Sequence, residues 1–135
     1  MRIRRGQVNQ VPVTVSELTT LTNPYYLFKF VDASNVPKYV LINSADDLAS
    51  ADQQVRFNEF EIEEVSSGAD PLTGKVTLVD GDYDYTIYEQ ASSTNINPAN
   101  STGIVENGIC TVYSVPSEIE NKVYNKTVTN KVYNG

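Results

Sequence analysis

The chain has 135 residues, with 17 acidic and 10 basic side chains, a formal charge of −7, no histidine, no tryptophan and one cysteine. This length suits a single domain that buries its core without disulfide bonds or a metal ion. The acidic total argues against nucleic acid as the main partner. No apolar run approaches the roughly 20 residues that span a bilayer, and none follows the basic start, so we expect neither a membrane protein nor a secreted one.

The charges are distributed unevenly along the chain. Residues 46–89 contain twelve acidic and two basic side chains, whereas basic residues gather towards both ends. We predict an acidic body flanked by two arms, residues 1–10 and 117–135, that contact acidic protein surfaces, including neighbouring copies. The alternative is that these terminal charges are only solvated. The side chains expected to bind partners are Arg2, Arg4, Arg5, Lys122, Tyr124, Lys126, Lys131 and Tyr133.

Apolar residues alternate with polar ones through most of the chain, which indicates half-buried strands. The expected strands are residues 11–18, 25–32, 37–43, 55–65, 75–79, 82–89 and 103–115. A skipped apolar position suggests a bulge or a bend at Asn58 and Glu59. Only residues 44–54 suit a helical turn, with Ser44 as its cap. About seven strands separated by turn residues predict an all-β fold, a single immunoglobulin-like antiparallel β-sandwich over residues 11–116. A jelly roll or small barrel is the alternative.

The acidic segment VDGDYDYTIYEQ, residues 79–90, is the main candidate for chemistry. Asp80, Asp82 and Asp84 have the spacing that opens an EF-hand loop, but the required glycine at the sixth position and glutamate at the twelfth are missing. As a strand, the segment turns its aspartates outward and Tyr83 and Tyr85 inward. A calcium site that combines Asp80 or Asp82 with a neighbouring loop stays open as an alternative, and so does a pair of carboxylates for glycoside chemistry.

Residues 78–83 also suggest the corner that precedes a strand in immunoglobulin-like sandwiches. There a tyrosine hydroxyl group bonds to the backbone of the turn, and glycine supplies the unusual turn conformation. Gly81, Tyr83 and Tyr85 are therefore predicted to be structural. Cys110 lies in an apolar alternating run and is expected to be buried. Without histidine, and without nucleophile, phosphate-loop or dinucleotide motifs, we expect no enzyme activity, no cofactor and no metal.

The last nineteen residues contain a repeat, Lys122-Val-Tyr-Asn125 and Lys131-Val-Tyr-Asn134. Their asparagine, threonine and valine residues are poor helix formers, and their apolar content is too small for a second core. We predict an extended arm that adds to the sheet edge of a neighbour while Tyr124 and Tyr133 fill surface pockets. The alternative is an unstructured tail.

Four stretches together suggest a family: residues 23–30 (NPYYLFKF), 56–60 (RFNEF), 81–90 (GDYDYTIYEQ) followed by Ser93-Thr94-Asn95, and 105–108 (VENG). They resemble a small virion protein of tailed bacteriophages, of the auxiliary or decoration type, from crAss-like phages or phages of marine Bacteroidetes. The resemblance does not extend to either predicted arm. It implies a virion protein assembled in the host bacterial cytoplasm, with the major capsid protein or other virion proteins as partners. A head–tail connector or tail component is the alternative within that family.

A second class of function also fits the composition. A carbohydrate-binding or adhesin-type sandwich would use aromatic side chains as a platform, and Tyr25, Tyr26, Tyr39 and Tyr88 are its candidates. The absence of tryptophan and of a secretion signal counts against this class.

Overall fold

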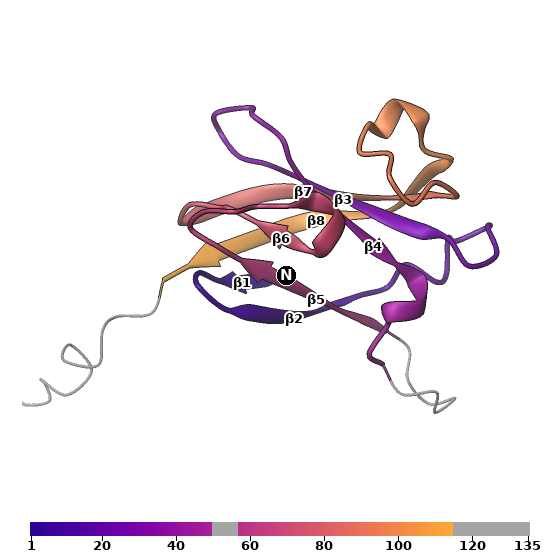
Figure 1. Cartoon of the computed structure of the whole chain (residues 1–135), viewed down its shortest axis with the longest axis horizontal. Coiled ribbons are helices and arrows are strands. Elements are labelled where there is room, and N and C mark those ends of the chain that lie inside the picture. The colour runs from indigo at the N-terminus through magenta and orange to yellow at the C-terminus, as the bar shows by residue number, and fades with distance from the viewer. Residues whose placement is uncertain (50–56, 115–135) are drawn as a thin grey trace, which may run out of the picture.

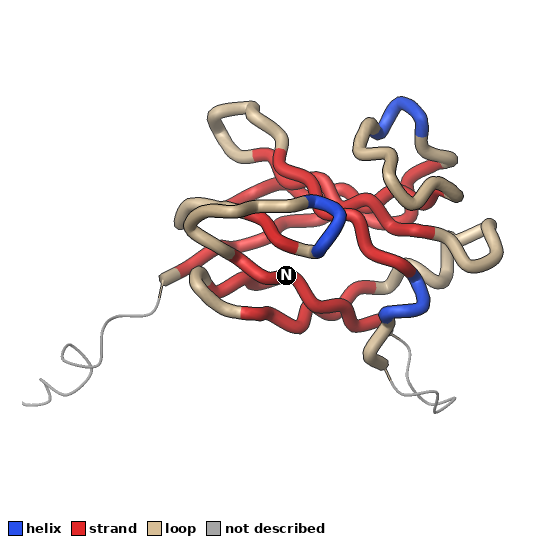
Figure 2. The backbone as a smooth tube through the Cα atoms, viewed as in Figure 1, coloured by secondary structure: helices blue, strands red, loops and turns tan. Residues whose placement is uncertain are grey.

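The computed structural model describes residues 1–49 and 57–114, which form two β-sheets packed face to face (Figure 1). The five-stranded sheet has the spatial order β1 (Arg2–Arg4), β8 (Gly103–Tyr113), β7 (Gly81–Gln90), β3 (Tyr25–Val31) and β4 (Lys38–Asn43). The three-stranded sheet has the order β2 (Val8–Val13), β5 (Asn58–Glu64) and β6 (Lys75–Val76). Three short 3-10 turns, η1 (Ser44–Asp46), η2 (Pro71–Thr73) and η3 (Pro98–Asn100), lie in the connections (Figure 2). The prediction of an all-β fold is confirmed.

Residues 1–10 belong to the domain, so the predicted N-terminal arm is wrong. β1 pairs with β8, and β2 begins at Val8 in the other sheet. Ile3 is completely buried between two arginines, which gives β1 the alternation of a strand. A strand of three residues is too short for its period to be visible in the sequence. The sequence signal that remains is the charge of the three arginines, which led to the prediction of an arm.

Two strand pairs are parallel, which corrects the prediction of a purely antiparallel sandwich. β1 pairs in parallel with β8, and β5 with β6. β1 and β2 are consecutive but lie in different sheets, and the chain crosses between them at Gly6, which has a φ of 77°. Residues 65–74, which include η2, bring the chain back so that β6 runs in the same direction as β5.

The core lies between the two sheets and takes side chains from both. Phe28 of β3 and Phe60 of β5 meet edge to face with ring centroids 6.2 Å apart, and Tyr26 lies 5.7 Å from Phe60. Such pairs stabilise a core beyond the area they bury. Cys110 is completely buried, as predicted, and burial raises the pKa of its thiol to about 11.

β7 has the alternation that the sequence predicts. Tyr83, Tyr85 and Ile87 point into the core, whereas Asp82 and Asp84 are exposed. The two aspartates of this strand therefore lie on the outer face of the five-stranded sheet.

No bulge lies at the predicted position in β5. β5 begins at Asn58 and pairs with β2 in regular register, so residues 58 and 59 contain no bulge. The register instead shifts between Ile87 and Tyr88, where β7 pairs with β8. The helical turn is present as η1, but its cap is Asn43, whose side chain accepts a hydrogen bond from the N–H of Ala45. The remainder of the predicted turn, residues 50–54, lies outside the described residues.

Candidate interaction sites

Tyr83 connects β7 to the corner that precedes it. The N–H of Val79 donates to the Tyr83 hydroxyl oxygen at 2.9 Å. Gly81, between them, has a φ of 134°, which side-chain-bearing residues rarely adopt. Burial raises the pKa of the Tyr83 hydroxyl group. Because the chain crosses here from β6 in one sheet to β7 in the other, this hydrogen bond stabilises the crossover.

Tyr85 joins both sheets through one carboxylate. Its hydroxyl group donates to Oε2 of Glu106 at 2.5 Å, while Oε1 accepts from the N–H and hydroxyl group of Thr14, just after β2. Gly108 lies against the Tyr85 ring, where an added Cβ would be 3.0 Å from Cε1. Burial and the Glu106 carboxylate hold the pKa of Tyr85 well above its ordinary value. Glycine at position 108 therefore makes room for this tyrosine.

Glu89 continues the inward row of β7 and is only 3% exposed. Its carboxylate accepts from the N–H and hydroxyl group of Thr20 and from the N–H of Leu21. Burial alone would raise the pKa of Glu89, but these donors hold it below its ordinary value. The next residue, Gln90, donates to the carbonyl of Asn95 and accepts from its side-chain amide. The end of β7 thus fixes two neighbouring loops.

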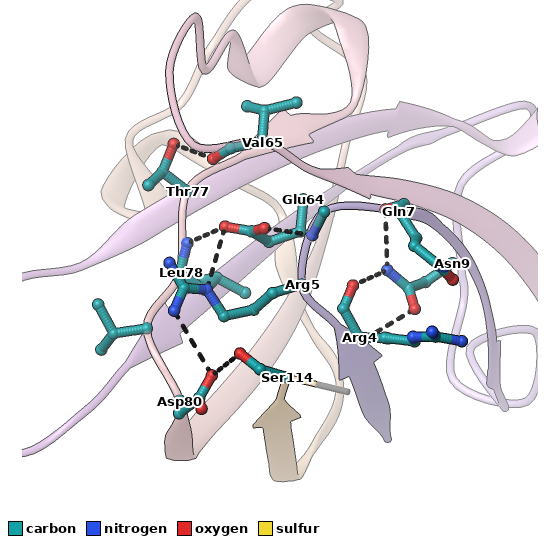
Figure 3. A network of polar contacts seen from close by, with 12 residues as sticks. Arg4, Arg5, Gln7, Asn9, Glu64, Val65, Thr77, Leu78, Asp80 and Ser114 are labelled. Atoms are coloured by element: carbon teal, nitrogen blue, oxygen red, sulfur yellow. Dashed lines mark hydrogen bonds and ion pairs between the residues drawn. The ribbon is translucent and has the colours of Figure 1, made fainter. Parts of the chain in front are cut away.

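Glu64 is the buried acceptor of a network that joins both sheets (Figure 3). It is 3% exposed, and its two carboxylate oxygens accept from the N–H of Gly6 at 2.7 Å and of Leu78 at 3.0 Å. The Nε of Arg5 lies 3.9 Å from Oε2 of Glu64, and Nη1 of Arg5 lies 3.6 Å from Asp80. The turn after β1, the end of β5 and the corner before β7 therefore meet at one carboxylate.

All three arginines predicted to bind partners contact their own domain. Arg5 forms the ion pairs just described, and the guanidinium of Arg2 lies 4.5 Å from the ring centroid of Tyr113. The backbone of Arg4 exchanges two hydrogen bonds with the side chain of Asn9. Arg2 is exposed and Arg4 is half-buried. Partner binding by these residues stays a prediction.

The predicted C-terminal arm begins just beyond the described part of the domain. β8 ends at Tyr113, and the hydroxyl group of the following Ser114 donates to Asp80 at 2.8 Å. The predicted partner-binding residues of this arm lie outside the described residues; they are Lys122, Tyr124, Lys126, Lys131 and Tyr133.

Three of the four candidate platform tyrosines lie on the outer face of the five-stranded sheet. Tyr25, Tyr39 and Tyr88 are partly exposed on β3, β4 and β7, at positions that alternate with the core residues. Tyr26 instead points into the core and is excluded from such a platform.

A shallow hollow of about 360 Å³ lies on this outer face, between β7 and β8. Tyr88 borders it together with Ile104 and Ile109, and both isoleucines are more than half exposed. Asp84 adds a carboxylate to the rim. The hollow therefore offers an apolar contact area with an acidic edge.

A groove of about 480 Å³ lies between β4, the last strand of the five-stranded sheet, and β5 of the other sheet. Residues of η1 and η2 complete its walls. No lysine or arginine is among the described residues that line it. We call it the β4–β5 groove and define it by its main apolar and acidic residues: Leu41, Leu48, Leu72, Asp46, Asp47 and Glu61.

The aspartates considered as calcium ligands already accept hydrogen bonds within the domain. Within residues 1–49 and 57–114, no group of three histidine, cysteine or acidic side chains is placed to hold a metal ion. The alternative calcium ligands Asp80 and Asp82 accept hydrogen bonds from Ser114, just after β8, and from Thr111, near its end.

The described residues 1–49 and 57–114 contain no helix that is long and apolar enough to cross a membrane.

Comparisons of the chain with protein-family models, with curated proteins and with solved structures gave no match. Its function must therefore be inferred from its own residues and their geometry.

Proposed function

We propose that this chain is a non-enzymatic structural protein of a tailed-phage virion, an auxiliary protein that decorates the capsid shell. The observation that carries the proposal is the use of the β7 side chains. Residues 81–90 include the longest stretch behind the family resemblance. They direct Tyr83, Tyr85 and Glu89 inward, where each binds another segment of the domain. Distinctive residues that build the fold favour a structural role over catalysis.

At a finer level, the fold we propose is an immunoglobulin-like sandwich. Two sheets that face each other across an apolar core support it, as does a tyrosine whose hydroxyl group holds the chain where it crosses between them. The parallel pairs β1–β8 and β5–β6 are additions at sheet edges, and the four central pairings are antiparallel.

The partner we propose is the major capsid protein, bound through residues 117–135 and one sheet face. The described domain is acidic, and its ion pairs within the described residues are those of Arg5. Exposed carboxylates such as those of Asp46, Glu61 and Asp84 are thus left to face solvent or a basic partner. A shell presents many identical sites, so weak contacts repeated over many copies give stable attachment.

The test is incorporation into particles. A chain that lacks residues 117–135 should unfold in urea like the full chain but be lost from particles purified after infection. A chain in which these residues are replaced by a glycine–serine segment of the same length controls for bulk and reach. Incorporation of either variant at the level of the full chain would refute docking through this segment. A head–tail connector or tail component would show the same loss but would occupy the vertex or tail.

The second candidate is a carbohydrate-binding or adhesin module, which the shared outer face of Tyr25, Tyr39 and Tyr88 favours. Saturable glycan binding that is abolished by Tyr88→Ala, and retained in Tyr26→Phe, would support this function. If no glycan binds, the carbohydrate-binding function is refuted and the structural role is the remaining candidate.

A further inference from the structure

The hydrogen-bond pattern of β5 leaves one residue open towards the β4–β5 groove. In an antiparallel pair, residues alternate between those that bond the partner strand and those whose N–H and C=O point away. The N–H of Glu64 donates to the carbonyl of Gln7, so Glu63, Glu61 and Glu59 point away from β2. The N–H of Glu63 donates to Gly74.

Glu59 is also satisfied, because its N–H donates to the Asp47 carboxylate and its carbonyl accepts from Leu48. Among the described residues, no hydrogen bond is found for the backbone N–H or C=O of Glu61, which lies between these two points, although a Cβ added at Gly74 would lie 3.7 Å from its carbonyl oxygen. The open backbone groups of Glu61 thus face the groove that its side chain also lines.

β4 presents a matching edge on the opposite wall. It is the outermost strand of its sheet and pairs only with β3 among the described strands. The N–H of Ser44 donates to the carbonyl of Pro24, which fixes the phase of this pair. The N–H and C=O of Leu41 therefore point away from β3, towards the groove. An extended segment in the groove would find backbone partners on both sheets, and such edges recruit added strands.

The acidic side chains of the groove favour a basic segment as its ligand. Asp46 and Glu61 form no ion pair within the described residues, whereas Asp47 accepts hydrogen bonds from the neighbouring backbone. Residues 121–135 contain three lysines and no acidic side chain. In an extended strand, residues i and i+2 share a face. The lysine and tyrosine of each Lys-Val-Tyr-Asn repeat would then enter the groove together, with the ammonium group near the carboxylates and the ring against Leu48 and Leu72.

The spacing of the two repeats favours grooves on further copies. β8 ends at one end of the sandwich and η1 lies at the other (Figure 1). The two repeats start nine residues apart, about 30 Å when extended, whereas the six residues of β4 span about 20 Å. One groove therefore holds one repeat, and a chain with two repeats can join two further copies.

We propose that residues 121–135 of one copy bind as an added strand in the β4–β5 groove of a second copy. This rests on the part of the proposed function that assigns docking to the C-terminal segment, and it names the acceptor. It does not require a virion, so it is measurable on the purified chain.

The first test is a charge exchange followed by sedimentation velocity over a range of protein concentrations. Glu61→Lys and Lys131→Glu should each weaken self-association by roughly two- to fivefold, the effect of one exposed ion pair. An equimolar mixture of the two variants should recover part of the loss. Glu17→Lys, an exposed charge change outside the groove, should match the unmodified chain. A monomer at every concentration, or equal weakening by Glu17→Lys, would overturn the proposal.

The second test locates the contact by disulfide trapping. Leu72→Cys and Tyr133→Cys are placed on chains of different mass and mixed under oxidising conditions. The native Cys110 is buried and has a raised pKa, so it gives little background. The disulfide-linked mixed dimer should form with Leu72→Cys. Its yield should be at least several-fold lower with Ile109→Cys, an exposed position on β8. Equal yields with Leu72→Cys and Ile109→Cys would contradict binding in the groove. If the disulfide forms only when Leu72→Cys and Tyr133→Cys are on the same chain, and only within that chain, binding to a second copy is contradicted.

The two proposals fail separately. A chain that is incorporated into particles without self-association would overturn this inference and leave the proposed function intact. A chain that self-associates through the groove but is absent from particles would do the reverse.

Discussion

Replacing Glu64 by glutamine tests whether one buried carboxylate holds the N-terminal strand, β5 and the corner before β7 together. The two N–H donors, from Gly6 and Leu78, bond to different oxygens of the carboxylate. Glutamine keeps one acceptor oxygen and presents an NH₂ group to the other donor. It also removes the negative charge beside Arg5.

The expected loss follows from these contacts. A hydrogen bond to a charged group contributes about 1.5–3 kcal/mol, and a buried donor left without an acceptor costs about 1–3 kcal/mol. We therefore expect Glu64→Gln to lower the free energy of unfolding by roughly 2–4 kcal/mol, since the two contributions overlap. With a urea m-value of about 2 kcal/mol/M, the middle of the usual range, the midpoint should fall by roughly 1–2 M.

The assay is equilibrium unfolding in urea at low protein concentration, with Glu63→Gln as the matched control. Glu63 is the preceding residue of β5 and faces the other side of the strand, so its change should stay within about 0.5 kcal/mol. If Glu64→Gln lies within that same range, the carboxylate does not hold both donors and the integration of residues 1–10 must have another cause.

Three further predictions concern β7 and β8. Tyr83→Phe removes the acceptor of a backbone N–H in the corner and should cost about 1–2 kcal/mol of unfolding free energy in urea; an unchanged value would exclude the corner as a stabilising contact. Gly108→Val should cost roughly 1–3 kcal/mol because the side chain meets the Tyr85 ring, whereas Gly103→Val, where no neighbour lies within 4 Å of an added Cβ, should cost clearly less; equal losses would argue against the clash. Glu89 has a folded pKa below its unfolded value of about 4.3. Its contribution is therefore present at neutral pH and lost as pH falls through the folded pKa. Glu89→Gln should flatten the decline of unfolding free energy between about pH 5 and pH 3, and a decline parallel to that of the unmodified chain would contradict this assignment.

Alternation was enough to predict most strands and the two faces of β7. It predicted inward positions for Tyr83 and Tyr85 because every second residue of the strand is apolar or aromatic. The same period also points to a buried carboxylate that was not predicted. Glu64 follows Phe60 and Ile62 on the inward face of β5, and a glutamate at such a position must find buried donors.

Other features depend on contacts between distant segments. Ile3 is buried only because β1 pairs with β8, more than one hundred residues later. The β4–β5 groove arises where two strands of different sheets meet η1 and η2, and no local pattern contains that arrangement. The failure to predict the parallel pairs has the same origin, because the direction of a pair depends on the connection and not on the period of either strand.

The most direct measurement of the central claim, that this chain is a virion protein, is cryo-electron microscopy of the phage particles that the proposed function assigns to it, with mass spectrometry of the same preparation. We predict density for a two-sheet sandwich at regularly repeated positions on the capsid shell, and the chain present in many copies per particle. Abundant chain in infected cells together with its absence from purified particles would contradict the account.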